Sequence, residues 1–437
     1  MSKFNLVDMD KPAQHVPRVL LLTLLIVTIG VAADVVAHTS AHPDGRVAFS
    51  FDASAWKSHD DMRRLPIGVF DSGIGGLTVM EALLKLDVYN NETRKRGADG
   101  VPDFAQERFI YFGDQANMPY GQYPAAERTD FLRELILKDA VFLLGRRAWP
   151  AIGNQPTYTK LPVKAIVIAC NTATAYGLDD IRAAVATWKI PVVVVGVVEA
   201  GARAVLSAEY DGGIGVLATV GTCASGAYPR TITSTLGLAG HSVPLIVQQG
   251  SATLAGVIEG NAAFPEPVST YVMREVRALA DTYRAQKPTK PLAAIVLGCT
   301  HFPLIERELA TAFTALRAEP GWSDLIAEHL VFVNPAEATA LELYRLLAHS
   351  DLRLKSGQTC DLVRDQFYIS VPRSESPGVK LAADGSLDRD YKYTRQPGNL
   401  EREDTKNVPM TPATLPESSV NLLRNKLHEV WKRLGGG

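Results

Sequence analysis

Two segments of this chain resemble each other, and each carries one cysteine. Residues 166–175 read IVIACNTATA and residues 295–304 read IVLGCTHFPL. In both, an apolar run typical of a β-strand ends at a cysteine, and small hydroxyl or amide residues follow. A single cysteine of this kind is usually a small buried apolar residue. Two in equivalent places of a repeated sequence predict a site with a thiol on each side, Cys170 and Cys299.

Both cysteines are expected where a strand ends, which is where ligands bind in open α/β sheets. A helix N-terminus at that point would stabilise a thiolate and lower its pKa. Cys223 and Cys360 lack the repeated setting and are interpreted as structural. The polar side chains expected at the same edge of the sheets are Asp71, Ser72, Asn171, Thr172, Thr174, Thr300 and His301.

The elements that position these residues alternate between short β-branched or aromatic runs and helical stretches. This pattern predicts an α/β fold with largely parallel, buried strands. The run IGVFDS at 67–72 has a partner in IGVLAT at 214–219, so each half of the chain opens with a similar strand. Strands are expected at 66–70, 109–112, 165–169, 192–195, 215–217, 294–297 and 331–333. Helices are expected, among others, at 77–86, 125–144, 175–186, 201–208 and 269–285.

Composition excludes several classes of protein. The 437 residues are 46% apolar, enough for two or three domains with sizeable cores. A net charge of −2 gives no basic field for nucleic acid, and four cysteines are too few for a disulfide framework. The glycines of DSGIGG at 71–76 lack the lysine and the spacing of a phosphate-binding loop. A nucleotide site is therefore not expected, and no residue is assigned to a metal.

The N-terminus carries fifteen uncharged residues, VLLLTLLIVTIGVAA at 19–33, after several basic residues and before small ones. This pattern favours a cleaved signal peptide and hence a periplasmic protein. An uncleaved inner-membrane anchor facing the periplasm is the first alternative. The second is a buried helix or a wrongly assigned start codon, which would leave the protein in the cytoplasm.

The chain divides into five predicted parts. Residues 1–40 are the leader or anchor, and 41–65 are a linker. Residues 66–197 form a first domain, which about 330–349 and parts of the tail complete, and residues 198–329 form a second. The tail, 350–437, is expected to be extended, with a strand at 366–371, a loose segment at 372–417 and one helix at 420–434. Two polar stretches, 87–106 and 147–161, are interpreted as surface insertions.

Six short motifs, in order and in spacing, resemble those of glutamate racemases in the aspartate/glutamate racemase superfamily. They are DSGIGG at 71–76, MPYG at 118–121, ACNTAT at 169–174, GVVEAGAR at 196–203, ATVGT at 218–222 and GCTH at 298–301. The resemblance covers about residues 66–347, and more faintly 366–371 and the last helix.

The resemblance implies two similar α/β domains related by a pseudo-two-fold axis, with the active site in the cleft between them. It implies a cofactor-independent racemase in which the thiols face opposite sides of the substrate Cα, since racemisation needs an acid and a base that exchange roles. Cys170 and Cys299 would be this pair, assisted by Asp71 and His301 respectively. The residues that would bind the substrate are Asp71, Ser72, Tyr120, Gly121, Asn171, Thr172, Thr222, Glu259, Thr300 and His301.

One segment departs from the resemblance. Glutamate racemases usually carry a stretch similar to CPxFVPLVE, but residues 251–259 read SATLAGVIE, and only the end, with Glu259, matches. Interconversion of L- and D-glutamate is therefore the leading prediction. A racemase acting on aspartate or several amino acids and a weakly active exported binding protein remain alternatives. A small amino acid is the expected partner, a homodimer is left open, and any membrane contact would involve only the N-terminal segment.

Overall fold

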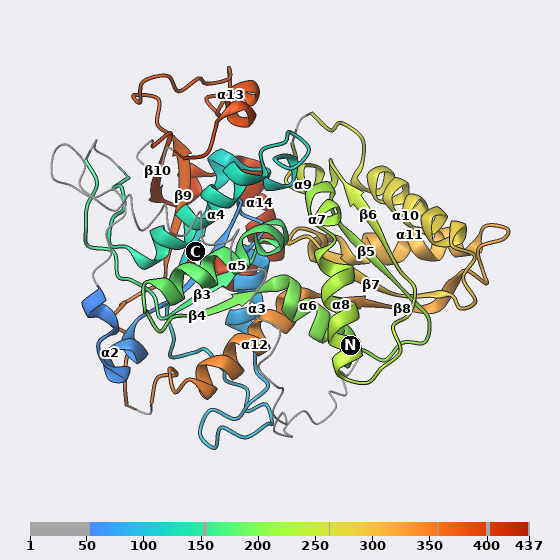
Figure 1. The fold of residues 1–437 in the computed structure, drawn as a ribbon, viewed down its shortest axis with the longest axis horizontal. Coiled ribbons are helices and arrows are strands. Elements are labelled where there is room, and N and C mark those ends of the chain that lie inside the picture. Colours follow the sequence, from blue (N-terminus) through green and yellow to red (C-terminus); the bar gives the residue numbers. More distant parts are fainter. Residues whose placement is uncertain (1–52, 152–154, 262, 356, 399–402, 436–437) are drawn as a thin grey trace.

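The computed structural model describes residues 53–151, 155–261, 263–355, 357–398 and 403–435. Two lobes lie side by side, each built on its own β-sheet (Figure 1). The described part of the chain contains no helix long and apolar enough to cross a membrane. The predicted leader at 19–33 lies outside the described residues.

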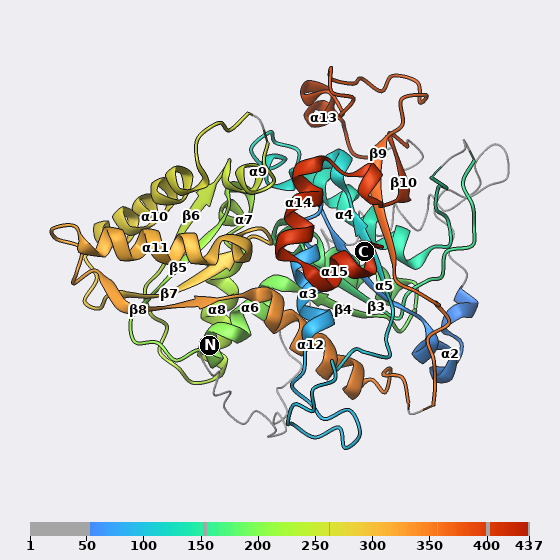
Figure 2. The ribbon, with the colours of Figure 1, turned by 180° about the vertical axis from the view of Figure 1, so that it is seen from behind.

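The first lobe contains a six-stranded sheet in the order β10-β9-β2-β1-β3-β4. Every neighbouring pair is parallel except β9 and β10. α4 and α5 pack together on one face, and α3 packs against α12 and α15 on the other (Figures 1 and 2). The strands are β1 (Ile67–Asp71), β2 (Phe109–Gly113), β3 (Ala165–Ile168), β4 (Val193–Gly196), β9 (Gln366–Pro372) and β10 (Thr405–Pro409). The helices are α3 (Leu77–Lys85), α4 (Thr129–Leu144), α5 (Asn171–Thr187), α12 (Pro335–His349) and α15 (His428–Arg433).

The second lobe contains a four-stranded, fully parallel sheet in the order β6-β5-β7-β8. α10 and α11 pack on one face, whereas α6 and α8 pack on the other. The strands are β5 (Gly213–Thr219), β6 (Ile246–Ser251), β7 (Leu292–Gly298) and β8 (Ile326–Val333). The helices are α6 (Val197–Ser207), α7 (Val220–Ser225), α8 (Ala227–Leu238), α9 (Leu254–Ile258), α10 (Val268–Ala285) and α11 (Glu306–Ala318).

The repeat seen in the sequence is also a repeat of strand register. In the first sheet Ile67 pairs with Ala165, and in the second Ile214 pairs with Ala294. Strands β2-β1-β3-β4 of the first sheet are arranged in the same way as strands β6-β5-β7-β8 of the second, so that β1 corresponds to β5 and β3 corresponds to β7. The α/β prediction with two mainly parallel sheets is confirmed. Cys170 follows β3 and Cys299 follows β7, so the two thiols leave equivalent strands.

Alternation along the strands divides the core of the second lobe between the two faces of its sheet. Val216 and Val296 pack toward α6 and α8, while Leu217 and Leu297 pack toward α10 and α11. Successive side chains of a strand point to opposite faces, so a strand buried on both sides is apolar throughout. This explains why these strands are continuous apolar runs.

The tail is more ordered than the sequence predicts. The segment 372–417, expected to be loose, contains α13 (Arg389–Thr394) and β10, which pairs antiparallel with β9. The single helix expected at 420–434 is two helices, α14 (Glu417–Lys426) and α15, because Leu427 between them is not helical (φ −124°, ψ 70°). Short polar strands such as β10 depend on a partner strand that is distant in the sequence, which local patterns do not reveal.

Two further segments differ from expectation. Residues 53–65 belong to the predicted linker, yet they form η1 (Ala53–Trp56) and α2 (His59–Arg64), and Trp56 Nε1 donates to the carbonyl of Val163 at 3.0 Å. In the predicted surface insertion at 147–161, Trp149 and Lys160 are buried. The other insertion is exposed throughout 92–101. Trp56 and Trp149 therefore anchor the segments 53–65 and 147–161 to the first lobe.

Candidate active site

Cys170 lies at the junction of β3 and α5. It is the N-cap residue of α5, and its Sγ accepts a hydrogen bond from the backbone N–H of Ala173 at 3.4 Å. The thiol also donates to Ser72 Oγ, 3.7 Å away, so the loop after β1 reaches the same point. The helix N-terminus predicted at this cysteine is therefore present.

The pKa of Cys170 nevertheless moves upward, opposite to the direction predicted from the helix N-terminus. Burial raises it most and the charge of Asp71 raises it further, and together they outweigh the contacts with Ala173 and Ser72. Removal from water destabilises the thiolate more here than the nearby N–H dipoles stabilise it. Cys170 consequently carries its proton at neutral pH and can serve as an acid.

Asp71 ends β1 and is fixed by the glycine-rich turn. Its Oδ2 accepts hydrogen bonds from the N–H groups of Gly73 and Gly76, at 3.1 and 3.0 Å, while its buried Oδ1 has no hydrogen-bond partner among the described residues. Burial raises the pKa of Asp71, although the charge of His301 and both N–H groups lower it. A carboxylate with a raised pKa and a free oxygen can accept a proton from a neighbouring thiol.

Cys299 has a different set of partners. It lies in a turn after β7, and its Sγ is 3.7 Å from His301 Nδ1, whose Nε2 lies 2.7 Å from Glu259 Oε1. Burial lowers the pKa of His301, but the contacts with Cys299 and Glu259 outweigh it and raise this pKa well above its ordinary value. A protonated imidazole places a positive charge next to the sulfur of Cys299.

Both thiols line one small cavity of about 40 Å³ between the two lobes. The first lobe contributes Cys170 and the loop 118–121, and the second contributes Cys299 and α9. One acid/base group from each lobe thus faces the same space. The lining residues are Ser72, Met118, Pro119, Tyr120, Gly121, Cys170, Asn171, Thr172, Thr219, Ala255, Cys299, Thr300 and His301.

Most predicted substrate-binding residues lie on this wall, but three lie behind it. Asp71 lies behind Cys170, and Glu259 lies behind His301. Thr222 is fully buried, with its Oγ1 3.0 Å from the hydroxyls of Thr172 and Thr219. These three residues support the cavity wall without lining it.

Tyr120 lines the cavity without offering its hydroxyl to it. The hydroxyl lies 2.5 Å from Asp114 Oδ2 and 2.7 Å from Asp139 Oδ2, in a buried cluster on the side away from the thiols. Burial, followed by the charge of Asp114, raises the pKa of Asp139 well above its ordinary value. The sequence analysis did not identify this cluster.

The lobes are joined by hydrogen bonds around the site. Thr172 Oγ1 lies 3.0 Å from Thr219 Oγ1, Tyr228 donates to Asn171 Oδ1 at 2.6 Å, and Thr78 donates to the carbonyl of Thr300 at 3.0 Å. Thr219 is a wall residue that sequence analysis missed, although the ATVGT motif contains it. Among the described residues, no group of three or more His, Cys, Asp or Glu could hold a metal ion.

Comparison with known proteins agrees with this geometry. Residues 146–323 match a family described as Asp/Glu/Hydantoin racemase. A glutamate racemase of Limosilactobacillus fermentum is 34% identical over 257 residues, 57% of this chain and 74% of that protein. One from Enterococcus faecalis is 30% identical over 289 residues, 65% of this chain and 80% of that protein. This chain belongs to the aspartate/glutamate racemase family.

A solved structure of a glutamate racemase from Bacillus anthracis covers 70% of this chain and 87% of its own, with 26% identity and a TM-score of 0.48. The resemblance stated from the motifs is confirmed at the level of the family. Strands β1 and β2 and the tail lie outside the residues that match the family description.

Proposed function

We propose that this protein interconverts L- and D-glutamate by two-base proton transfer at Cα. The observation that carries the proposal is that two cysteines from different lobes line one cavity, each with its own proton-accepting partner. The relatives named glutamate racemase support glutamate as the substrate.

In one direction the Cys299 thiolate, paired with protonated His301, removes the Cα proton and becomes a thiol. The Cys170 thiol then delivers its proton to the opposite face of Cα and becomes a thiolate. The reverse direction starts from the state in which Cys170 is the thiolate and Cys299 is the thiol. The free enzyme reaches this state from the first one when Asp71 accepts the proton of Cys170 and protonated His301 gives its proton to Cys299. The two states differ only in the location of protons.

The Cα–H of an amino acid is a very weak acid, so the developing negative charge needs hydrogen-bond donors that are already in position. Asn171, Thr172 and Thr300 supply such donors on the cavity wall. The hydroxyl of Thr172 is oriented by Thr219 and Thr222. The contacts between the lobes thus also serve transition-state stabilisation.

The experiment is deuterium uptake at Cα of L-glutamate in D₂O, followed by mass spectrometry, with the Cys170→Ala, Cys299→Ala double variant as control. We expect uptake with inversion in the natural protein and none in the double variant. Uptake that survives in the double variant would contradict the two-thiol mechanism, and the absence of uptake from any amino acid tested would indicate a binding protein.

A racemase acting on aspartate or several amino acids is the second candidate. The departure of residues 251–259 from the glutamate racemase pattern favours it, because Ala255 of that segment lies on the cavity wall. The same uptake measurement with L-aspartate decides between them. A kcat/KM for aspartate equal to or above that for glutamate would replace our leading assignment.

A further inference from the structure

The tail of the chain contacts the loop that forms one wall of the cavity. This loop, residues 114–123, contains the wall residues Met118–Gly121. Lys392 Nζ, on α13, donates to the carbonyl of Met118 at 2.7 Å, and the Tyr393 hydroxyl lies 3.4 Å from the carbonyl of Pro119. Two consecutive carbonyls of the wall are therefore bound by consecutive residues of one tail helix.

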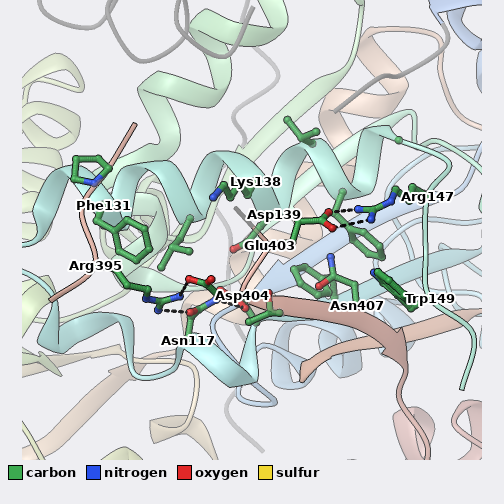
Figure 3. A pocket seen from close by; sticks show the side chains of 18 of the residues that line it. Asn117, Phe131, Lys138, Asp139, Arg147, Trp149, Arg395, Glu403, Asp404 and Asn407 are labelled. Atoms are coloured by element: carbon green, nitrogen blue, oxygen red, sulfur yellow. Dashed lines mark hydrogen bonds and ion pairs between the residues drawn. The ribbon is translucent and has the colours of Figure 1, made fainter. Parts of the chain in front are cut away.

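A second contact comes from Arg395, directly after α13. Its guanidinium donates to Asn117 Oδ1 at 2.5 Å and to the Tyr123 hydroxyl at 3.2 Å, and it pairs with Asp404 (Figure 3). Arg395 is buried, and its planar group lies over the ring of Phe131 at 4.7 Å. A buried arginine with this many partners connects the middle and the last residue of the loop to the tail.

A third contact runs through β9 to the cavity itself. Ser370 Oγ donates to Asp114 Oδ1 at 2.7 Å and accepts from the N–H of Ala116 at 2.9 Å. Asp114 in turn holds the hydroxyl of Tyr120, which lines the cavity. A chain of hydrogen bonds therefore leads from the tail strand to the wall.

Apolar packing also contributes to this contact, since the ring of Tyr393 meets that of Tyr123 edge to face, with ring centroids 4.8 Å apart. Ala116 of the loop packs on Leu387 and Tyr391 in a small cluster. Beyond it, a cavity of about 440 Å³ separates α4 from the tail, with Arg395 at one end and the Arg147–Glu403 ion pair at the other (Figure 3). The position of the loop relative to the tail therefore depends on a few identifiable side chains.

We propose that the tail, through Ser370, Lys392 and Arg395, positions the substrate loop 114–123 and thereby the wall residues Tyr120 and Gly121. These three are positioning residues, because they act on substrate only through the loop. The effect on activity rests on the proposed racemase function, whereas the effect on the loop does not.

The test compares Lys392→Met, Arg395→Lys and Arg395→Met in the full chain. Loss of a charge-assisted hydrogen bond to the loop should raise KM for glutamate about tenfold and change kcat by less than about twofold. The reason is that the loop contacts the substrate in the ground state and in the transition state alike. The KM of Arg395→Lys should lie between those of the natural protein and Arg395→Met, since lysine keeps the positive charge but not the planar guanidinium with its several N–H donors.

A second readout follows amide hydrogen exchange of a peptide spanning 114–123. The amides of Asn117, Met118 and Tyr123 are hydrogen-bonded within the loop and should be protected in the natural protein. Exchange there should become about tenfold faster in Lys392→Met, with second-lobe peptides unchanged. Lys380→Met, an exposed lysine of the same tail, is the matched control and should change neither readout.

Unchanged KM and unchanged loop exchange in both Lys392→Met and Arg395→Met would overturn the proposal. Equal acceleration in all first-lobe peptides would also overturn it, because the tail would then only stabilise the lobe. If the natural protein exchanges no amino acid, the racemase assignment fails, and the amide exchange alone decides whether the tail positions the loop.

Discussion

At the scale of single residues, the two thiols share a cavity but have different electrostatic partners. Burial, followed by the charge of Asp71, raises the pKa of Cys170, whereas Cys299 faces a histidine that can carry a positive charge. The equilibrium constant of a racemisation is one, so kcat/KM is equal in both directions whatever the asymmetry of the site. The asymmetry can appear only in the separate values of kcat and KM and in proton exchange.

The single cysteine variants test this division of roles. Cys170→Ala should lower inversion about 10³-fold, the size expected for loss of an acid/base group, yet leave Cα exchange of one enantiomer. Cys299→Ala should leave exchange of the other enantiomer only. Deuterium uptake measured separately on L- and D-glutamate checks this, and exchange of both enantiomers in either variant would refute it.

The sequence motifs predicted which candidate acid/base residues lie close together, but not the directions in which their pKa values are shifted. Short motifs specify the residues that follow each strand, so Cys170, Cys299, Asp71 and His301 were found together. The pKa of Cys170 depends on burial and on Asp71, which lies 99 positions earlier in the chain. For the same reason, the orientation of the Tyr120 hydroxyl toward Asp114 and Asp139 had no sequence signal.

Lys160 gives a prediction about stability. It is buried, its Nζ donates to the carbonyls of Leu143 and Leu161, and burial, followed by the charge of Arg146, lowers its pKa to about 7. In the unfolded chain this pKa is about 10.4. Between these values the unfolded state binds the proton and the folded state does not, so this group makes stability rise with pH across that window.

Lys160→Met should remove this rise. The difference in unfolding free energy between the natural protein and the variant should shift in favour of the natural protein by on the order of 1–3 kcal/mol from pH 7 to pH 9.5. Thermal or urea unfolding at the two pH values measures it. A difference that stays constant with pH would show that Lys160 does not lose its proton in this window.

At the scale of elements, strands with apolar runs were predictable and strands completed by distant partners were not. β7 and β3 were found from their sequences, but β6 contains Gln248, Gln249 and Gly250 and gave no strand signal. It exists because it pairs with β5 along its whole length. The same reason explains β10 in the tail.

The turn after β1 gives a prediction for an element. A Cβ on Gly75 would lie 2.3 Å from His301 Cε1 and 2.5 Å from Thr300 Oγ1, so the turn approaches the other lobe as closely as a glycine allows. Gly75→Ala should displace His301 and lower kcat/KM about 100-fold, the cost of misplacing a catalytic group by about 1 Å.

Gly237→Ala, in α8, is the matched control, since a Cβ there meets nothing within 4 Å. It should leave kcat/KM unchanged and raise the melting temperature slightly, because alanine favours a helix. Initial rates and thermal unfolding of both variants make the comparison. Normal activity in Gly75→Ala would mean that the lobes can separate at this turn without loss of function.

At the scale of the whole molecule, we propose that the protein is exported by its N-terminal leader, which lies outside the described residues. The charged residues before 19–33 and the small residues after it support a signal peptide. Expression in a Gram-negative host should yield a periplasmic protein that begins after residue 33 or 37. N-terminal sequencing checks this, and a chain that still begins at residue 1 in the soluble cytoplasmic fraction would contradict it.

The contact between α13 and the loop 114–123 also sets an order of events during synthesis. Lys392 and Met118 are 274 positions apart, so strands β1 to β8 have all been synthesised before the chain can bind its own loop. If the tail positions the loop as we infer, full activity requires that residues 392–395 have left the ribosome. If the protein is also exported, as we propose, this delay would limit its activity in the compartment where it is made.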